Sequence, residues 1–489
     1  MKFSEHSLTV SAHPFPATEQ LLVSGGDARI ALDPHSGLNK YGCQPYPDPQ
    51  MLALGSSTAS VISAASFAAA EQLRDRLLQE LDSAPLAAVY PREMQRIRTE
   101  LLCGLDDLDI ELVFATSGTD AHSIVARHVA NASGTPLRVV MVEEAETGSG
   151  VAAALAGQHC KTGSSAGTDR SEAIEVCSVP LRAADGTTRP ADCIDADVVV
   201  LVNEAVVQGG RVLLVMVDQS KTGLIAPSPA CVAGLRHRHP QYLDILVDAC
   251  QFRIAPPTLR AYLQQGFMVA LTGSKFFTGP SFSGVLLFPA SMGQRLKLRA
   301  ADGAGAANFG LLLRWEAALI ELRRFRAVPE SVVVGFMRAF EQAVQQRLMN
   351  DPRFEPLEVP SLKREPFTIR QSWDHIQSIF PFMLYRPETA AGRIPLNRDQ
   401  MLQIYRQLPV EVDGAASLRC QLGQPVACGT REGVPVSALR LCISARLISD
   451  AYEGKGIDGV IDEAWAALDK IAWLVDRLND QQTRAVIRG

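Results

Sequence analysis

Short apolar runs rich in β-branched and aromatic residues alternate with helical stretches along the first two thirds of the chain. Runs of this length, bounded by turn-forming residues, are typical of buried strands. The predicted strands are residues 111–115, 137–142, 174–178, 211–217, 242–248, 267–272 and 283–288. A helix is predicted over residues 121–130, directly after the first strand. This alternation predicts an α/β fold with a mostly parallel, seven-stranded sheet and helices on both faces.

The last third of the chain has a different order of elements. Residues 309–328 predict a long helix that leaves the large domain. After it, the pattern predicts helices over 332–348, 398–408 and 457–478 and strands over 376–385 and 438–445. This mixture is typical of a smaller α+β domain. Because 489 residues exceed the size of one ordinary core, we expect three parts: an N-terminal segment over 1–50, a large domain over 51–310 and a small domain over 311–489.

Composition narrows the class of protein. Hydrophobic residues make up 47% of the chain and charged residues 20%, as in a soluble globular protein. The net charge of −6 offers no basic surface for nucleic acid or for an anionic membrane. We find no signal peptide and no apolar run long enough to span a bilayer, so we expect a cytoplasmic protein.

The cysteines and histidines do not form a metal-binding pattern. Ten cysteines are scattered without a Cys-x-x-Cys pair or a zinc-like spacing. Reduced thiols in the cytosol are the simpler interpretation. His237 and His239 lie close in sequence, but no carboxylate or cysteine accompanies them. We therefore predict no metal site.

Polar residues follow several of the predicted strands. They lie at positions 116–119, 220–223 and 248–251 and at Lys275. In parallel sheets, ligands gather at the carboxyl ends of the strands. These residues are therefore expected to converge on one crevice.

The most informative pair is Asp248 and Lys275, each of which follows a predicted strand. A lysine amine can hold the aldehyde of pyridoxal phosphate (PLP) as a Schiff base, while a carboxylate keeps the pyridine nitrogen protonated. The alternatives are a helix cap or salt bridge for Asp248 and a solvated loop cation for Lys275. Apolar residues before Lys275, with Phe276 and Phe277 after it, indicate that the amine is not fully exposed. Gln251 could hydrogen-bond the phenolic oxygen of the cofactor.

Ser117, Gly118 and Thr119 join a predicted strand to the helix after it. Backbone amides of a first helical turn, with hydroxyl groups beside them, suit a phosphate dianion. The same residues would cap the helix in any α/β protein, which is the alternative. The glycines match neither the dinucleotide-binding pattern nor the P-loop pattern. Any phosphate site here is therefore of another kind.

Two arginines near the end of the chain are candidates for substrate binding. Arg446 follows the predicted strand over 438–445. A guanidinium there could hold a substrate carboxylate through a bidentate pair. Arg440, earlier on the same strand, could take that role instead. A salt bridge is the alternative for Arg446.

Together these residues resemble the class V aminotransferase family of fold-type I PLP-dependent enzymes, especially its cysteine desulfurases and kynureninase-like members. The resemblance runs from about Thr116 to Arg446. It is specific in Val247-Asp248-Ala249-Cys250-Gln251, Thr272-Gly273-Ser274-Lys275 and Gly279-Pro280. It implies the fold-type I architecture, with a large PLP-binding domain and a smaller C-terminal domain.

The resemblance implies a role for each matching residue. Lys275 is the Schiff-base lysine, Asp248 contacts the pyridine nitrogen and Gln251 contacts the ring hydroxyl. Arg446 is the expected carboxylate-binding arginine. Tyr41 lies outside the resemblance, in an opening segment that is longer than the family norm, and is expected to bind the substrate. The residues expected near the phosphate or the rest of the cofactor are Ser117, Gly118, Thr119, Thr147, Ser220, Thr272, Ser274 and Asn308.

Several positions depart from the family pattern. The stretch 144–149 lacks the histidine that stacks on the cofactor ring in many desulfurases. Ser274 stands in place of the histidine before the lysine, and Ser220 in place of an asparagine. The mobile nucleophilic cysteine has only loose counterparts in Cys420 and Cys428. These changes keep cofactor binding but weaken the case for the desulfurase reaction.

We expect a PLP-dependent enzyme that acts on an α-amino acid through an external aldimine and a Cα carbanion (quinonoid), as an aminotransferase or lyase. A cysteine desulfurase or C–S lyase is the alternative. A catalytically silent binding or sensor protein is a candidate of another class, against which the Asp248–Lys275 pair argues. The expected partners are an amino-acid substrate and a second subunit in a homodimer, with no nucleic acid and no membrane. The glycine-rich stretch 303–308 is the candidate for reaching the phosphate of that second subunit.

Overall fold

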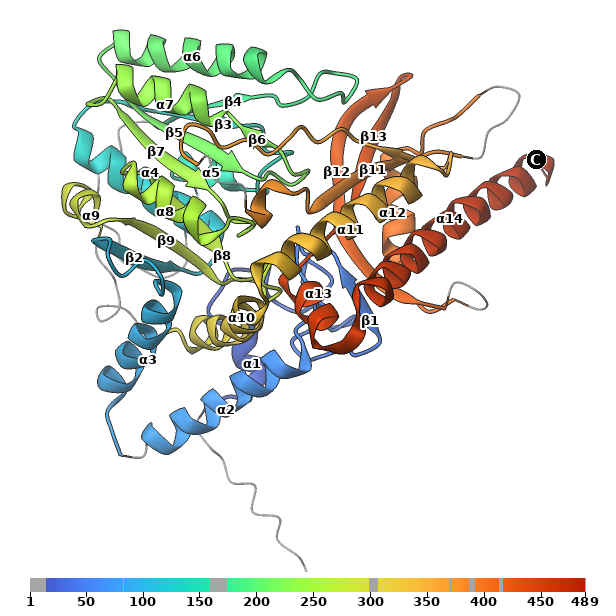
Figure 1. The fold of residues 1–489 in the computed structure, drawn as a ribbon, viewed down its shortest axis with the longest axis horizontal. Helices are drawn as coiled ribbons and strands as arrows, with labels where there is room; N and C mark the ends of the chain where they lie inside the picture. The colour runs from blue at the N-terminus through green and yellow to red at the C-terminus, as the bar shows by residue number, and fades with distance from the viewer. Residues whose placement is uncertain are drawn as a thin grey trace, which may run out of the picture.

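The computed structural model of the chain describes residues 15–81, 83–158, 174–298, 307–368, 372–386, 392–412 and 417–488. These residues form two β-sheets with helices packed around them (Figure 1). The larger sheet is built from the first two thirds of the chain. The smaller sheet joins strands of the C-terminal third to one strand near the N-terminus.

The larger sheet has the strand order β2-β9-β8-β7-β5-β3-β4, and a short strand, β6, pairs with β5. Its strands are β2 (Ile110–Ala115), β3 (Leu137–Val142), β4 (Glu175–Val179), β5 (Arg211–Asp218), β6 (Ile225–Ala226), β7 (Leu243–Asp248), β8 (Met268–Thr272) and β9 (Gly284–Pro289). Neighbours from β8 to β4 are parallel, whereas β9 is antiparallel to both β8 and β2. Each of the seven predicted strands is therefore present, in a mostly parallel sheet.

Helices cover both faces of this sheet because its central strands are apolar on both sides. On β3, Val139 and Met141 pack into one buried cluster, while Val140 and Val142 pack into another. The first cluster includes α4 (Gly118–Ser133), α5 (Val151–Leu155) and α9 (Ala290–Leu296). The second includes α6 (Ala191–Val207), α7 (Pro229–Arg238) and α8 (Pro256–Gln264). The predicted helix over 121–130 lies inside α4.

The smaller sheet has the order β1-β12-β13-β11-β10. Its strands are β1 (Met51–Leu54), β10 (Phe354–Pro356), β11 (Ile379–Leu384), β12 (Arg419–Arg431) and β13 (Val434–Cys442). β1 runs parallel to β12. The first residues of the range predicted for the large domain therefore pair with the small sheet instead.

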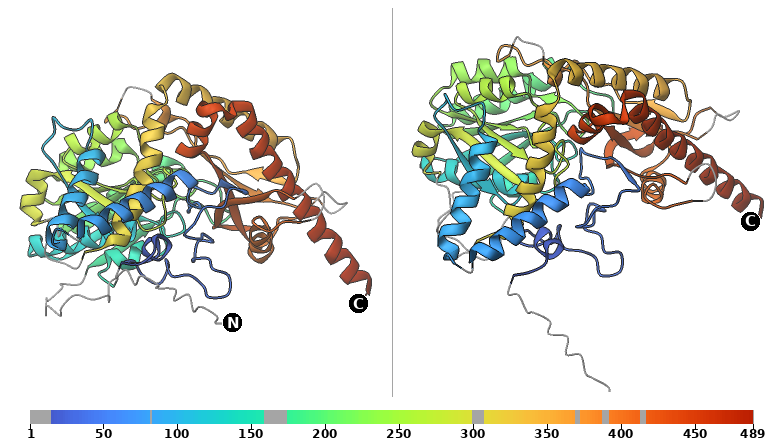
Figure 2. Two further views of the ribbon diagram at one scale, coloured as in Figure 1. Left: turned by 90° about the horizontal axis from the view of Figure 1, so that it is seen from below. Right: turned by 60° about the horizontal axis from the view of Figure 1, so that its bottom comes forward.

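Helices of the last third pack around the small sheet. They are α11 (Glu330–Met349), α12 (Arg398–Gln407), α13 (Ala445–Asp450) and α14 (Ile457–Arg488), with short turns at Trp373–His375 and Ala451–Lys455. α11 and α12 contact the sheet, and α14 contacts both of them. The C-terminal end of α14 extends away from the rest of the molecule (Figure 2).

Helix α10 (Phe309–Ala327) connects the two parts of the molecule, as predicted. It contacts α1 (Thr18–Leu22), α2 (Ala64–Leu81), α3 (Leu86–Leu101) and α13. Helices α2, α3 and α6 were not predicted from the sequence. Within α6, a run of valines favours a strand by propensity, but Ile194, Val198 and Val202 are buried at helical spacing. In the described part of the chain, no helix has the length and apolar character that crossing a membrane requires.

Candidate functional site

A cavity of about 320 Å³ lies at the carboxyl edge of the large sheet. β2, β7 and β8 all end at this edge, because β2 and β8 are both antiparallel to β9. β9 begins at the same edge, which brings Ser281 and Ser283 into the lining. Eight of the predicted site residues line the cavity: Tyr41, Ser117, Gly118, Thr119, Asp248, Thr272, Ser274 and Lys275.

Asp248 ends β7 and is buried. Its Oδ2 lies 3.3 Å from Nε2 of His122, and its Oδ1 accepts a hydrogen bond of 3.1 Å from the backbone N–H of Cys250. Burial by itself raises the pKa of Asp248, but His122, the amine of Lys275 and the thiol of Cys250 together hold that pKa well below its usual range. The carboxylate is therefore ionised at neutral pH.

His122, which was not predicted, lies on α4 one turn after Gly118. Its Nδ1 is 2.7 Å from the carbonyl oxygen of Gly118, which can only accept, so Nδ1 carries a proton. Nε2 faces the Asp248 carboxylate, although without the alignment of a full hydrogen bond. Burial lowers the pKa of His122, but the neighbouring Asp248 outweighs it and raises that pKa. An imidazolium held against the carboxylate fits both contacts.

No sequence signal distinguishes His122 from an ordinary core histidine. The only hint is its spacing, because a residue four positions after Gly118 faces the same side of α4 as that glycine. Its partner Asp248 lies far away in the chain, at the end of β7. Only the packing of α4 against the large sheet brings the two together.

Lys275 lies on the turn after β8 and is half-buried. Among the described residues, its amine makes no hydrogen bond and no ion pair, although it faces the charge of Asp248. Phe276 and Phe277, directly after it, are buried and anchor the turn in the core. The amine is thus held inside the cavity and is free to react.

The start of α4 forms a cradle for an anion. Ser117 is the N-cap, and its Oγ accepts a hydrogen bond from the backbone N–H of Asp120. Arg29, from the N-terminal segment, donates to Thr119 Oγ1 over 3.2 Å and also pairs with Asp27. A cation beside the positive end of a helix is favourable when an anion lies between them. Arg29 was not predicted, and it strengthens the case for a phosphate at this helix end.

Close packing fixes the position of this cradle. A Cβ on Gly118 would lie 2.7 Å from Cys250 Sγ and 3.1 Å from Thr272 Cγ2. Thr272 in turn donates a hydrogen bond of 2.7 Å to the carbonyl oxygen of Cys250, and Ser274 Oγ lies 3.5 Å from Thr272 Oγ1. The glycine therefore allows α4 to begin directly against the ends of β7 and β8.

Four predicted cofactor residues do not line the cavity. Gln251 donates to the carbonyl oxygen of Ser57 over 3.1 Å. Asn308 caps α10 and donates to the carbonyl oxygen of Gly25. Residues 303–306 of the glycine-rich stretch lie outside the described residues.

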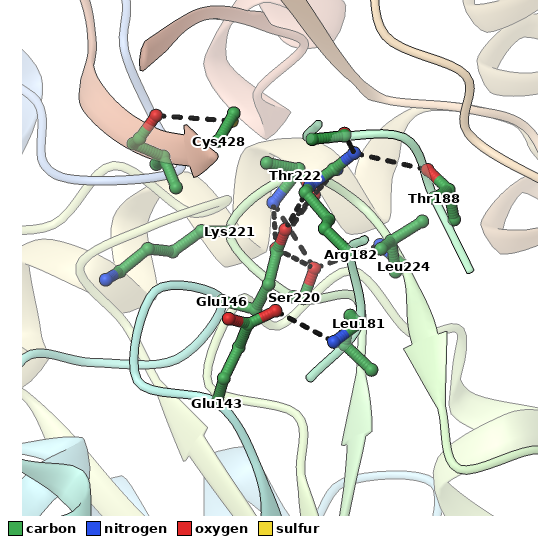
Figure 3. Close-up of polar contacts among 12 residues, drawn as sticks. Glu143, Glu146, Leu181, Arg182, Thr188, Ser220, Lys221, Thr222, Leu224 and Cys428 are labelled. Atoms are coloured by element: carbon green, nitrogen blue, oxygen red, sulfur yellow. Dashed lines mark hydrogen bonds and ion pairs between the residues drawn. The ribbon is translucent and has the colours of Figure 1, made fainter. Parts of the chain in front are cut away.

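The other two are Thr147 and Ser220. Thr147 is buried, and its Oγ1 has no partner among the described residues. It immediately precedes Gly148 and Ser149, which do line the cavity. Ser220 belongs to a buried cluster around Glu146 (Figure 3), because its Oγ donates to Glu146 Oε2 over 2.7 Å. This bond explains why the Ser220 hydroxyl does not face the cavity.

Arg446 was expected to follow the strand predicted over 438–445, and this expectation is wrong. β13 ends at Cys442, because Ser444 caps α13 and places Arg446 in that helix. The guanidinium donates to the carbonyl oxygens of Val61 and Thr278 and pairs with Glu321 over 3.3 Å. It lies at a second cavity of about 310 Å³, away from the predicted site.

Arg440, the competing candidate, lines the first cavity. It is 2% exposed, yet it has no ion-pair partner among the described residues. Its Nη2 donates to Thr58 Oγ1 over 2.9 Å and to the carbonyl oxygen of Gln424, and its Nη1 donates to the carbonyl oxygen of Lys221 over 3.3 Å. Its Nε has no partner in the described part of the chain. A buried guanidinium with a spare donor suits an anionic ligand.

His122, Asp248 and Cys250 also raise the question of a metal ion, because their ligand atoms lie within 4.8 Å of one another. Burial and the nearby Asp248 charge raise the pKa of the Cys250 thiol well above its usual range. A metal ion would have to displace the proton of this thiol and the second proton of the imidazolium before it could bind here. This arrangement suits hydrogen bonding to an organic ligand better.

A comparison with protein-family models finds no match, and neither does a comparison with curated protein sequences. Solved structures do match. A complex of the cystine C–S lyase C-DES with its product cysteine persulfide is 15% identical, covers 88% of this chain and 98% of the other, and has a TM-score of 0.53. TDC from Oryza sativa with PLP is 16% identical, with coverage of 85% and 84% and a TM-score of 0.49.

A third neighbour is the glutamate decarboxylase domain of a diaminobutyrate-pyruvate transaminase and L-2,4-diaminobutyrate decarboxylase from Vibrio parahaemolyticus. It is 14% identical, covers 87% of this chain and 80% of the other, and has a TM-score of 0.48. The neighbours are fold-type I PLP enzymes. The likeness to C-DES, with its TM-score above 0.5, confirms the predicted fold class. Membership of class V stays a prediction.

Proposed function

We propose that this protein is a PLP-dependent enzyme that acts on an α-amino acid, of the aminotransferase or lyase type. The observation that carries the proposal is the joint presence, in one cavity, of a lysine amine without a partner among the described residues and an ionised buried carboxylate. The anion cradle at the start of α4 opens on the same cavity. Aldehyde, pyridine nitrogen and phosphate are the three groups of PLP that these features would hold.

The residues fit PLP as follows. Lys275 would bind the aldehyde carbon, and Asp248 would hold the proton on the pyridine nitrogen. The first turn of α4, with Ser117, Thr119 and Arg29, would bind the phosphate. When bound, PLP supplies an electron-accepting ring that stabilises negative charge at the Cα of an amino acid.

The chain's own groups then carry the proton chemistry. When a substrate amine takes the place of Lys275 on the cofactor, the Nζ of Lys275 becomes free. It could then remove the Cα proton of the substrate and return that proton at another atom. Asp248 keeps the ring nitrogen protonated because its pKa is held low, and His122 keeps Asp248 charged and oriented. Arg440, which lines the cavity and pairs with no carboxylate of the described residues, would hold the substrate α-carboxylate. Tyr41, in the lining, would contact the substrate beside it.

A C–S lyase is the second candidate, supported by the likeness to C-DES. The cysteine desulfurase version of this idea needs a nucleophilic thiolate. Burial raises the pKa of Cys420 to about 12 and that of Cys428 to about 11. Both thiols are therefore protonated at neutral pH, which favours elimination chemistry over sulfur transfer to a cysteine. The homodimer and the cytoplasmic location stay predictions.

The test is the fate of a bound chromophore. Purified protein saturated with PLP should absorb in the visible range, and borohydride should bleach this absorbance and fix the cofactor to the chain. Lys275→Ala should lose the fixed cofactor and slow the exchange of amino-acid α-protons in D₂O by roughly 10²- to 10⁴-fold. Lys363→Ala, at an exposed lysine, is the control and should behave as wild type.

Two results would contradict the proposal. Wild-type protein that fixes no cofactor would support a catalytically silent protein. Lys275→Ala protein with undiminished fixation would show that another lysine holds the cofactor. Mass spectrometry of the reduced protein identifies the modified residue in either case.

A further inference from the structure

The cavity holds more positive than negative charge. Among the described lining residues, the cations are Arg29, Lys221, Lys275, Arg440 and the protonated His122, which faces the only carboxylate, that of Asp248. Arg29 has a partner in Asp27, and together with α4 it accounts for a phosphate. Lys275 and Asp248 account for the two ends of the cofactor ring. Lys221 and Arg440 are the two cations without an assigned anion, and the α-carboxylate of the substrate can neutralise only one of them.

Lys221 has no anionic partner in the described part of the chain. Its Nζ donates one hydrogen bond of 3.1 Å, to the carbonyl oxygen of Glu144, and an ammonium has three donors. Figure 3 shows its side chain turned away from the Glu146 cluster. Glu146 already accepts from Arg182 Nε over 2.9 Å and from the Ser220 and Thr222 hydroxyls. The carboxylate of Glu146 is therefore already engaged by these three groups.

Arg440 and Lys221 are neighbours, because Arg440 Nη1 donates to the backbone carbonyl of Lys221. The pKa of Lys221 falls to about 8 because burial disfavours its charge and because Arg440 and Lys275 lie near it, while Glu146 and Glu144 act in the opposite direction. Two adjacent cations with unused donors repel each other until anions bind. The site is therefore prepared for two negative groups, which lie only a few bonds apart in an acidic amino acid.

We propose that Lys221 binds an acidic group on the substrate side chain while Arg440 binds the α-carboxylate, so that the enzyme prefers α-amino acids with a second anionic group. This inference rests on the proposed function, because it takes Lys275 and Asp248 as the cofactor-holding pair. It adds the substrate class, which the sequence alone left open. Lys221 could instead make a second contact to the α-carboxylate. The two roles predict different effects of a Lys221 substitution, so an experiment can distinguish them.

The test uses unreactive acids that lack the amino group, so the readout is binding and not turnover. Glutarate and its monoamide, glutaramate, have the same shape and differ in one charge. With PLP-loaded protein, calorimetry should show that glutarate binds at least roughly 10-fold tighter than glutaramate, a difference of about 1.4 kcal/mol. Lys221→Met should remove this preference and leave glutaramate affinity within about twofold. Lys221→Arg should restore part of the preference, and Lys363→Met should change neither affinity.

Each other outcome overturns the inference. Equal affinities in wild type, or no binding of either acid, exclude an acidic side-chain subsite. Equal weakening of both acids by Lys221→Met assigns Lys221 to the α-carboxylate. The reducible chromophore, measured on every variant, shows that the site is intact. If wild-type protein shows no reducible chromophore, the proposed function is wrong. If it shows the chromophore but no preference for glutarate, only this inference is wrong.

Discussion

At the scale of single residues, the pairing of His122 with Asp248 decides the charge of the site. Two buried ionisable groups are stable only as partners, since an isolated buried charge is costly. His122 has its pKa raised and Asp248 has its pKa lowered, so both are charged over the same pH range. The pair thus supplies a permanent anion for the cofactor nitrogen without leaving net charge in the core.

This pairing predicts a pH dependence of the stability of the cofactor-free protein. Asp248 contributes above its unfolded pKa of about 3.9 and loses that contribution as the pH falls through its lower folded pKa. His122 contributes fully below its unfolded pKa of about 6.5 and loses that contribution as the pH rises through its higher folded pKa. His122→Gln should therefore cost most near pH 5 to 6, about 3 kcal/mol, and less at pH 9. Urea unfolding at each pH measures the difference.

His128→Gln, on the same helix, is the matched control. Burial lowers the pKa of His128, so a folded, charged His128 is disfavoured at low pH. The advantage of wild type over this variant should grow as the pH rises, opposite to the trend for His122→Gln. Parallel trends for both variants would contradict the ion pair.

At the scale of elements, the position of the anion cradle depends on how closely α4 meets β7 and β8. Ser117 and the first-turn amides can bind a phosphate only if α4 begins at the end of the sheet. Gly118 makes this possible because its missing Cβ leaves room for Cys250 and Thr272. Alanine favours helices more than glycine does. A loss of cofactor affinity in Gly118→Ala would therefore come from the steric contact of the added Cβ and not from a weaker helix.

Gly118→Ala should weaken PLP binding by at least roughly 10-fold, which corresponds to about 1.4 kcal/mol, because α4 must shift away from the cavity. Gly335→Ala is the control, since nothing lies within 4 Å of a Cβ at that position of α11. The control should keep wild-type affinity and gain about 0.5–1 kcal/mol of stability. Fluorescence titration of cofactor-free protein measures both affinities. An unchanged affinity in Gly118→Ala would show that α4 tolerates the contact.

At the scale of the whole molecule, buried polar contacts join the large sheet to the C-terminal third. Arg364, from the segment between β10 and β11, forms a two-point ion pair with Asp218 at the end of β5, with both distances 2.7 Å and both side chains fully buried. Tyr262 donates to the same carboxylate over 2.7 Å. Arg253 likewise reaches Ser56, just after β1, and Ile443, just after β13. These contacts fix the large sheet and the C-terminal third in one relative position.

Removal of one member of such a buried pair leaves the other charge without compensation. Arg364→Met should therefore lower the free energy of unfolding by about 3–5 kcal/mol. Arg189→Met breaks a surface pair with Asp197, which is 49% exposed, and should cost at most about 1 kcal/mol. Denaturant unfolding of both variants gives the comparison. Similar losses in the two would contradict a structural role for the Arg364–Asp218 pair.

The sequence by itself determined the local order of this protein. Strand β3 was predicted at its observed bounds, and the six other predicted strands of the large sheet within a few residues, because burial on two faces leaves continuous apolar runs. The short strand β6 was not predicted. Strand ends follow from these runs, so the apolar pattern alone is enough to place Asp248, Lys275 and the start of α4 at one edge of the sheet. The likeness to C-DES confirms the fold class that this pattern predicts.

Only the tertiary structure decided which distant residues complete the site. Arg29 and His122 reach the cavity through packing between segments far apart in the chain, and no periodicity encodes such contacts. β1 joins β12 across more than half the sequence, and the cap at Ser444 turns Arg446 away while Arg440 faces inward. Periodicity reports whether a side chain is buried, but the identity of its partner depends on long-range packing.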